Sequence, residues 1–392
     1  MKLAFCLFKY FPFGGLQRDF LRIALACRDR GHEIGVFVMK WEGDIPDAFK
    51  IDLVPVQKLT NHGNCAAFAR SLKQKDLDKY DVVVGFNKMP GLDIYFAADS
   101  CYQTRFQEAR TMFPRFGFRF RTYVSLEKAV FSPVSKTHIL ILSQKVKRNY
   151  VDAYGTPEER FSLLPPGIDL TAFDWRERIS VRKQVREEFG LGETFLLLMV
   201  GSAFRTKGVD RSIAAVASLP AGLRGKTRLF VIGQGNQRPL IRMAAKLGIE
   251  SRIRFLGGRE DVPRFLLAAD LLLHPSRNET YGMTLLEAMA AGLPVLATDN
   301  CGFAGHVEKA GAGLLIPSPF VQKTMNQMLA EALFSSEKNR WRENGLAFIA
   351  KSDISSLPQK AADIIENFTP LGRAGMKLLS RNTARRIIGL PA

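Results

Sequence analysis

The stretch HPSRNETYGMTLLEAMAAGLPVLATD, residues 274–299, decides the fold of the second half of the chain. Residues 270–274 form an apolar run typical of a buried strand, Tyr281 to Thr284 predict a turn, and Thr284 to Ala291 predict a helix that a glycine ends. A short loop then leads into a second apolar strand, Val295 to Thr298. Such a β-α-β unit has its ligand crevice at the turn that follows the first strand.

Two carboxylates flank this turn. Glu279 falls in the loop beyond the carboxyl end of the strand, and Glu287 falls one turn into the helix. Backbone N–H groups at Gly282, Met283 and Thr284, together with the positive end of the helix dipole, favour an anion there. Because carboxylates accept hydrogen bonds from sugar hydroxyls, the combination indicates a nucleotide sugar. An ordinary helix start, with a solvated Glu287 and acidic residues that merely complement the dipole, is the alternative.

With two glutamates separated by seven residues, the segment resembles the retaining GT-B enzymes of glycosyltransferase family four. The resemblance extends from Lys2 to about Phe368. FPFGGLQRDF (11–20), GFNKMPGLD (85–93) and LPPGI (164–168) are together similar to the lipopolysaccharide core heptose glucosyltransferases of Gram-negative bacteria. The resemblance implies an α/β protein with the GT-B fold, in which two Rossmann-like domains face each other across a cleft.

Composition is consistent with a globular protein of two domains. The 392 residues are enough for two hydrophobic cores, and 46% of them are hydrophobic. No apolar run approaches the ~20 residues that span a bilayer, and Phe5 to Phe13 is too short for a signal peptide, so we expect a cytoplasmic protein. The net charge of +18 calls for an anionic partner. Five scattered cysteines predict free thiols and no zinc site.

Apolar strands alternate with helical segments in both halves, which predicts parallel sheets covered on both faces. We expect residues 1–166 to form an acceptor domain and residues 167–352 a nucleotide-sugar domain. In the resembling family the last helix crosses back to the first domain, which implies the same for residues 353–370, and residues 371–392 form a basic tail. The expected strands are residues 3–8, 33–38, 51–56, 81–86, 94–97, 138–142, 195–200, 228–232, 253–255, 270–274 and 295–297.

Two loops offer partners for the phosphates of a nucleotide sugar. Gly14 and Gly15 lie between the first strand and a helix, where backbone N–H groups can approach a phosphate, although an ordinary turn fits equally well. The resemblance implies that this loop contacts the donor. Arg205 and Lys207 follow the first strand of the second domain, where two cations can stabilise a departing pyrophosphate. A solvated basic loop is the alternative there.

Further site residues are assigned by position. In relatives a loop of the second domain holds uracil by backbone contacts, which implies Gly258 and Arg259 at the base. We expect Glu287 to accept hydrogen bonds from the ribose hydroxyls and Glu279 to orient the glucose hydroxyls. Asp99, after the strand at 94–97, is a candidate to bind or deprotonate the acceptor hydroxyl, although a strand-end aspartate more often caps the next turn.

A metal site is not expected. The Asp76-Leu77-Asp78 sequence precedes a strand and so falls at its amino end, away from the ligand edge. The helix dipole, Arg205 and Lys207 can take the place of a divalent ion, so we predict no metal and no cofactor beyond the donor substrate UDP-glucose. His274, beside an apolar strand, is expected to be a hydrogen-bonded core histidine.

Residues from about 103 to 131 are expected to dock on a membrane. At residues 112–123 aromatic rings alternate with arginines, a composition that suits anionic inner-membrane lipids. Pro114 and Gly117 argue against a regular helix across the start, whereas Thr122 to Phe131 fit one. Related core glucosyltransferases dock in a similar region, which implies a cytoplasmic protein peripherally attached to the cytoplasmic face of the inner membrane. A core-packed loop with solvated arginines is the alternative.

The sequence therefore predicts a retaining glycosyltransferase that moves glucose from UDP-glucose to a heptose of the lipopolysaccharide inner core. Because no carboxylate is clearly placed for backside attack, we expect a same-face mechanism in which the departing phosphate oxygen deprotonates the acceptor. Another UDP-sugar or acceptor is an alternative, and a UDP-sugar 2-epimerase is a more distant one. The basic charge also suggests nucleic-acid binding, but no RRM, KH or helix-turn-helix signature is present, so no nucleic-acid partner is expected.

Overall fold

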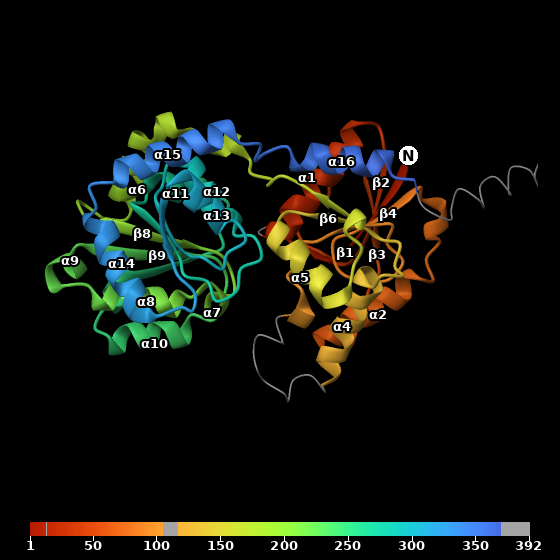
Figure 1. Ribbon diagram of the computed structural model, residues 1–392, viewed down its shortest axis with the longest axis horizontal. Coiled ribbons are helices and arrows are strands. Elements are labelled where there is room, and N and C mark those ends of the chain that lie inside the picture. Colours follow the sequence, from red (N-terminus) through yellow and green to blue (C-terminus); the bar gives the residue numbers. More distant parts are fainter. Residues whose placement is uncertain (13, 105–116, 370–392) are drawn as a thin grey trace, which may run out of the picture. The chain divides into compact units, whose positions relative to one another are not determined.

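A computed structural model describes residues 1–12, 14–104 and 117–369 of the protein (Figure 1). The chain divides into two compact units. Among the described residues, the N-terminal unit contains those of 1–164 and 356–369, and the C-terminal unit contains residues 165–355. The basic tail at 371–392 lies outside the described residues. Residues 105–116 of the expected membrane-docking segment lie outside them too.

The N-terminal unit is built on a parallel sheet. Its described strands follow the order β3-β2-β1-β4-β5-β6-β7. Because β1 pairs with both β2 and β4, the strand order reverses beside β1, which places the ligand edge at the carboxyl ends of these strands. The strands are β1 (Lys2–Tyr10), β2 (Glu33–Trp41), β3 (Phe49–Leu53), β4 (Val82–Gly85), β5 (Ile94–Phe96), β6 (His138–Ile141) and β7 (Phe161–Leu163).

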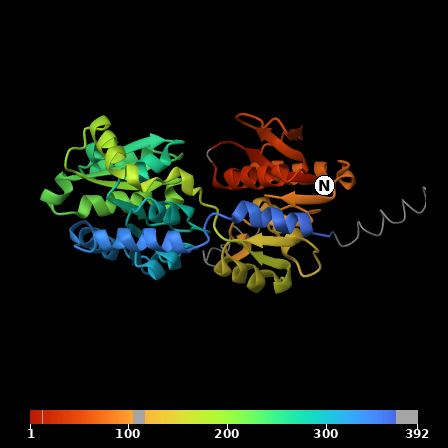
Figure 2. The ribbon, with the colours of Figure 1, turned by 90° about the horizontal axis from the view of Figure 1, so that it is seen from above.

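Helices cover both faces of this sheet (Figure 1). The apolar side chains of α1 recur at helical spacing, and Phe20, Ile23 and Cys27 are buried against the strands. The last described helix, α16, packs beside α1 (Figure 2), and Arg30 forms ion pairs with Asp363 at 2.7 Å and Glu366 at 3.1 Å. The α-helices given by the described residues of this unit are α1 (Gly15–Asp29), α2 (Asn61–Leu72), α4 (Phe118–Phe131), α5 (Gln144–Tyr154) and α16 (Leu357–Asn367).

The C-terminal unit repeats the architecture with the described strand order β10-β9-β8-β11-β12-β13, again all parallel. The strands are β8 (Phe195–Val200), β9 (Thr227–Ile232), β10 (Ile253–Gly257), β11 (Leu271–His274), β12 (Val295–Thr298) and β13 (Gly313–Ile316). The helices include α6 (Arg178–Glu188), α7 (Phe204–Lys207), α8 (Val209–Ser218), α9 (Ala221–Gly225), α10 (Arg238–Lys246), α11 (Val262–Ala268), α12 (Met283–Ala290), α13 (Ala304–Ala310), α14 (Gln322–Phe334) and α15 (Lys338–Lys351).

Two local expectations need correction. Residues 161–163, which are not among the expected strands, form the edge strand β7, because they pair with β6. The helix expected over Thr122 to Phe131 begins earlier, because α4 starts at Phe118, directly after Gly117. The five cysteines are free, as expected, and all of them are buried. Among the described helices, none is long and apolar enough to cross a membrane.

The packing of α16 generates a stability prediction. Ile365 is fully buried, so Ile365→Ala should leave a cavity and lower the free energy of unfolding by about 2–4 kcal/mol. Gln359→Ala, an exposed position of the same helix, is the control and should change it by less than about 0.5 kcal/mol. Denaturant unfolding followed by circular dichroism measures both. Equal stability of the two variants would show that α16 does not hold to the N-terminal unit.

Candidate active site

A cluster of charged side chains forms at the carboxyl edge of the C-terminal sheet, where β8 and β11 lie side by side. The loop after β8 leads into the short helix α7, which ends with Lys207. The loop after β11 carries Glu279 and leads into α12. Neighbouring parallel strands end at the same edge of a sheet, so residues 72 positions apart in the sequence meet here.

One carboxylate oxygen of Glu279 holds this cluster together. Glu279 Oε2 accepts a hydrogen bond from Lys207 Nζ and lies 3.0 Å from His274 Nε2. The same histidine nitrogen lies 3.2 Å from Ser276 Oγ. The side chain of His274 is 1% exposed, and that of Glu279 is 13% exposed. A nearly buried carboxylate is therefore compensated by a lysine and a histidine.

This environment keeps Glu279 ionised. Burial alone would raise the pKa of the carboxyl group, but the hydrogen bond with His274 and the positive charge of Lys207 outweigh it and lower the pKa to about 2. A carboxylate with so low a pKa is a poor proton acceptor near neutral pH. It is suited to accept hydrogen bonds from hydroxyl groups.

Close backbone packing fixes the loops that carry Lys207 and Glu279. Gly208 has a φ of +76°, and a Cβ atom there would lie 2.1 Å from the carbonyl oxygen of Pro275. The backbone N–H of Arg277 donates to the carbonyl of Thr206 at 2.8 Å, and the Arg277 guanidinium forms two hydrogen bonds with Asp210 at 2.8 and 2.6 Å. The distance between the two loops is therefore set by the backbone and by Arg277.

The turn before α12 has the expected form. Gly282 adopts a φ of +78°, a conformation that favours glycine, and α12 begins at Met283. The first N–H groups of a helix have no acceptor within it, so those of Met283 and Thr284 suit an anionic ligand. Glu287 is only 8% exposed, which excludes the alternative of a solvated surface glutamate.

Other candidates of the C-terminal unit are placed differently. Arg205 is exposed, and its carbonyl accepts a hydrogen bond from Arg277 at 2.7 Å. The Arg259 guanidinium forms two hydrogen bonds with Asp261, at 2.6 and 2.8 Å, so its charge is already compensated. Gly258 lies beside the Gln234 side chain. The structure thus brings Lys207 into the Glu279 cluster, while the side chains of Arg205 and Arg259 lie outside it.

In the N-terminal unit, Gly14 and Gly15 stand at the start of α1. A Cβ atom at Gly14 would overlap Gln17 Oε1 at 1.8 Å, whereas the space around Gly15 is open. The Gln17 side chain in turn donates to the carbonyl of Lys9 at 3.0 Å. Gly14 therefore has a packing reason to be glycine, and Gly15 leaves room for a ligand to approach the backbone.

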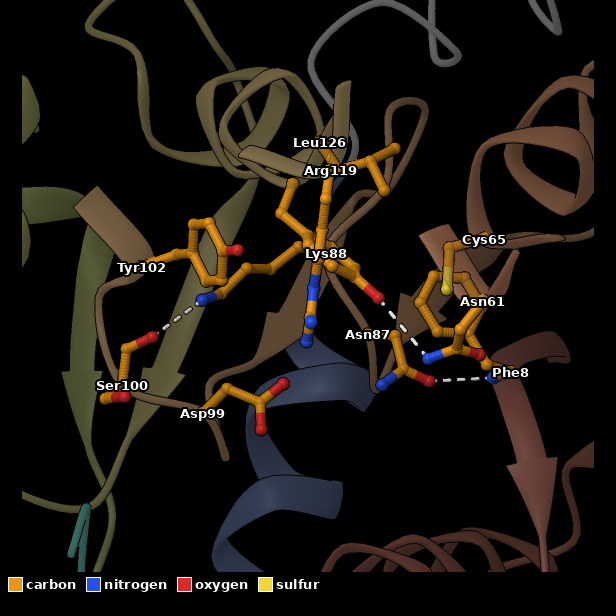
Figure 3. A pocket seen from close by; sticks show the side chains of 11 residues that line it. Phe8, Asn61, Cys65, Asn87, Lys88, Asp99, Ser100, Tyr102, Arg119 and Leu126 are labelled. Carbon is orange, nitrogen blue, oxygen red and sulfur yellow. Dashed lines mark hydrogen bonds between the residues drawn. The ribbon is translucent and has the colours of Figure 1, made fainter. Parts of the chain in front are cut away.

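Asp99 lies at a cavity of about 290 Å3 in the N-terminal unit (Figure 3). Its backbone carbonyl accepts a hydrogen bond from the Tyr150 hydroxyl at 2.7 Å. Figure 3 shows the Arg119 side chain pointing from α4 into the cavity, toward Asp99 and Asn87. The cavity is lined by Phe8, Asn61, Cys65, Asn87, Lys88, Asp99, Ser100, Tyr102, Arg119, Tyr123 and Leu126.

Some functional candidates were missed from the sequence. His274 is buried, as expected, but its hydrogen bond with Glu279 makes it part of the cluster. Its position at the end of a strand, five residues before Glu279, was the available signal. Asn61, Asn87 and Arg119 line the cavity around Asp99, but nothing in their spacing groups them, because they come from separate segments of the N-terminal unit.

Two family models match the chain. One described as Glycosyltransferase Family 4 matches residues 13–172, and one described as Glycosyl transferases group 1 matches residues 181–347. The lipopolysaccharide glucosyltransferase WaaG of Escherichia coli K12 is 46% identical over 372 residues, which cover 93% of this chain and 98% of that protein. The chain belongs to glycosyltransferase family 4. The family and enzyme class predicted from the sequence are thereby confirmed.

Solved structures of glycosyltransferases agree with the fold. The crystal structure of WaaG has a TM-score of 0.90 and 45% identity, covering 93% of this chain and 100% of that chain. The structure of Anabaena Alr3699/HepE in complex with UDP-glucose has a TM-score of 0.73 at 21% identity, covering 94% of this chain and all of that one, and shows the fold alone. The predicted fold class, two Rossmann-like domains with parallel sheets, is confirmed.

The contact between the two loops generates a prediction for Gly208. Gly208→Ala places a Cβ against the Pro275 carbonyl and forces a positive φ on alanine, so it should separate Lys207 from Glu279. A shift of about 1 Å can lower turnover about a hundredfold. Gly222→Ala in α9 has open space around the new Cβ and is the matched control. Equal transferase rates of the two variants would contradict the role of this contact.

The pKa of Glu279 predicts how stability depends on pH. Because folding lowers this pKa from 4.5 to about 2, the carboxylate stabilises the fold above pH 4.5, and this contribution is lost as the pH falls toward 2. Glu279→Gln cannot titrate. The difference in unfolding free energy between the parent protein and Glu279→Gln should therefore be constant from about pH 8 to pH 5 and decline below about pH 4.5. Urea titrations from pH 3 to 8 test this, and a difference that stays constant down to pH 3 would refute it.

Proposed function

We propose that this protein transfers glucose from UDP-glucose to a heptose of the lipopolysaccharide inner core, with retention at C1. The observation that carries the proposal is the Lys207–Glu279–His274 cluster, which places a cation and an ionised carboxylate at one ligand edge. The similarity to WaaG, a lipopolysaccharide glucosyltransferase, supports the donor sugar and the acceptor.

The cluster suits the two ends of a nucleotide sugar. Glu279 accepts hydrogen bonds from the glucose hydroxyls, because its carboxylate is ionised and fixed in place. Lys207 has three donor hydrogens, so it can bind Glu279 and a phosphate oxygen together. The first N–H groups of α12 bind the same pyrophosphate, and Glu287 on that helix binds the ribose. Arg205 completes the donor contacts of this unit, and Gly258 and Arg259 lie at the base. In the N-terminal unit, Gly14 and Gly15 at the start of α1 offer backbone N–H groups to a phosphate.

The transfer takes place without a divalent metal ion and without a cofactor. Lys207 and the amino end of α12 supply the positive charge that stabilises the departing UDP. Among the described residues, no group of three or more metal-ligating side chains is present. Asp76 directly precedes, and Asp78 lies within, a short 3-10 helix (Leu77–Lys79) that comes before β4, at the amino edge of the sheet.

Retention follows a same-face course. A carboxylate oxygen shared by Lys207 and His274 is a poor nucleophile, which disfavours a covalent intermediate on Glu279. The departing phosphate oxygen takes the proton of the acceptor hydroxyl, while Glu279 orients the sugar and stabilises the oxocarbenium-like transition state. Asp99 binds the acceptor in the cavity of the N-terminal unit.

The acceptor reaches this cavity from a membrane surface. Phe118, at the start of α4, is 83% exposed, and Arg121 on the same helix is exposed too. An aromatic ring near a cation suits the headgroup region of anionic lipids. The protein therefore docks peripherally on the cytoplasmic face of the inner membrane, where the lipid part of the acceptor lies.

The donor assignment predicts unequal effects of two neighbouring cations. Lys207→Ala should weaken UDP-glucose and UDP binding at least tenfold, because it removes the cation at the phosphates, while the exposed Arg205→Ala should have a smaller effect. Calorimetry with UDP measures both. Equal binding by the parent protein and Lys207→Ala would refute the assignment.

The reaction itself is tested with a panel of UDP-sugars and truncated core acceptors, with proton NMR of the product. UDP-glucose should be the preferred donor, the new linkage should keep the anomeric configuration of the donor, and activity should persist in excess EDTA. An inverted product would refute the same-face mechanism. Activity lost to EDTA and restored by magnesium or manganese would refute metal independence.

A further inference from the structure

Glu127 on α4 is a fully buried carboxylate outside the Glu279 cluster. It accepts hydrogen bonds from Lys88 Nζ and the Tyr154 hydroxyl, each at 2.6 Å. It also accepts from the backbone N–H groups of Tyr102 at 2.8 Å and Gln103 at 3.1 Å. Both oxygens are engaged, as a buried charge requires.

These bonds converge on residues 99–104, the segment that follows β5. Lys88 donates both to Glu127 and to the carbonyl of Ser100, at 2.9 Å, and the Tyr150 hydroxyl holds the carbonyl of Asp99. Residues 102–104 are helical, and the first N–H groups of a helix have no acceptor within it, so the carboxylate of Glu127 gives those of Tyr102 and Gln103 their acceptors. Three side chains of this segment, those of Asp99, Ser100 and Tyr102, line the cavity (Figure 3).

Glu127 also fixes the position of a charged side chain, Lys88, in the cavity wall. Lys88 and Asp99 line the same cavity and carry opposite charges, so they attract each other. The ion pair with Glu127 holds the Lys88 ammonium at the wall, where it also lies 5.3 Å from the centre of the Tyr150 ring. Lys88 is thereby kept from pairing with Asp99, which shares the cavity with the Arg119 side chain.

We propose that Glu127 is a positioning residue for the acceptor: it fixes residues 99–104 and Lys88 so that Asp99 and Tyr102 meet the acceptor sugar. The inference rests on the proposed function, in which this cavity binds the acceptor. Glu127 itself is not among the residues that line the cavity, so it acts through the segment it holds.

Tyr154 offers a way to weaken this arrangement without touching the cavity. Burial raises the pKa of the Tyr154 hydroxyl, and the negative charge of Glu127 raises it further, so the hydroxyl stays protonated and donates. Tyr154→Phe removes this one hydrogen bond and keeps the ring. Glu127→Gln keeps the shape of the side chain and removes its charge.

The test is steady-state kinetics of both variants with the acceptor and UDP-glucose varied separately. Each variant should raise the acceptor KM or lower kcat/KM for the acceptor about tenfold or more, with the UDP-glucose KM and the UDP affinity within about twofold of the parent protein. Hydrogen exchange followed by mass spectrometry should show faster exchange of the N–H groups of residues 102 and 103.

Thr156→Val is the matched control, because it removes a buried hydroxyl that donates to the carbonyl of Phe131 and does not bind residues 99–104. Donor and acceptor constants that change in parallel, or an acceptor effect equal to that of Thr156→Val, would show a merely structural role and overturn the inference. Unchanged acceptor constants in Tyr154→Phe and Glu127→Gln would overturn it as well. Failure of the parent protein to transfer glucose to any core acceptor would overturn the proposed function, and the inference with it.

Discussion

The hydrogen bond between Lys207 and Glu279 is the interaction on which the site depends. It requires β8 and β11 to end at the same edge of the sheet, so that the loops that follow them can meet. The parallel pairing of these strands provides this. Gly208 and Arg277 then hold the two loops in contact. The fold thus brings the two loops to the same edge of the sheet. Contacts between the loops then fix the position of the Glu279 carboxylate.

The parts of the fold that the sequence predicts are those with strong local signals. β11, α12 and β12 agree with expectation to within about one residue, because an apolar run, a glycine turn and a helical repeat follow one another without interruption. β7 and β13 were missed. They are edge strands and are mostly half-exposed, whereas β5 and β11, which are equally short and were predicted, are fully buried.

The same distinction applies to the site residues. Glu279, Glu287 and Lys207 follow from the local pattern and from the family resemblance. The contact of Arg277 with the loop after β8 depends instead on the adjacency of β8 and β11, which are separated in sequence by two strands of the sheet. The hydrogen bond of His274 is local, because Glu279 lies five residues later, but only the path of the loop after β11 shows that this buried histidine contacts a carboxylate.

Each unit contains a lysine–glutamate ion pair that holds a loop or segment in place. In the C-terminal unit Lys207 and Glu279 join the loops after β8 and β11, and in the N-terminal unit Lys88 and Glu127 hold the segment that follows β5. Burying such a pair brings little net stability, but breaking it leaves an uncompensated charge, at a cost of about 3–5 kcal/mol. A loop held in this way therefore has one strongly preferred position. That property matters most where a sugar must be oriented. Glu279 of the first pair is itself the side chain that we assign to the glucose hydroxyls, and the second pair holds the segment that carries Asp99, which we assign to the acceptor.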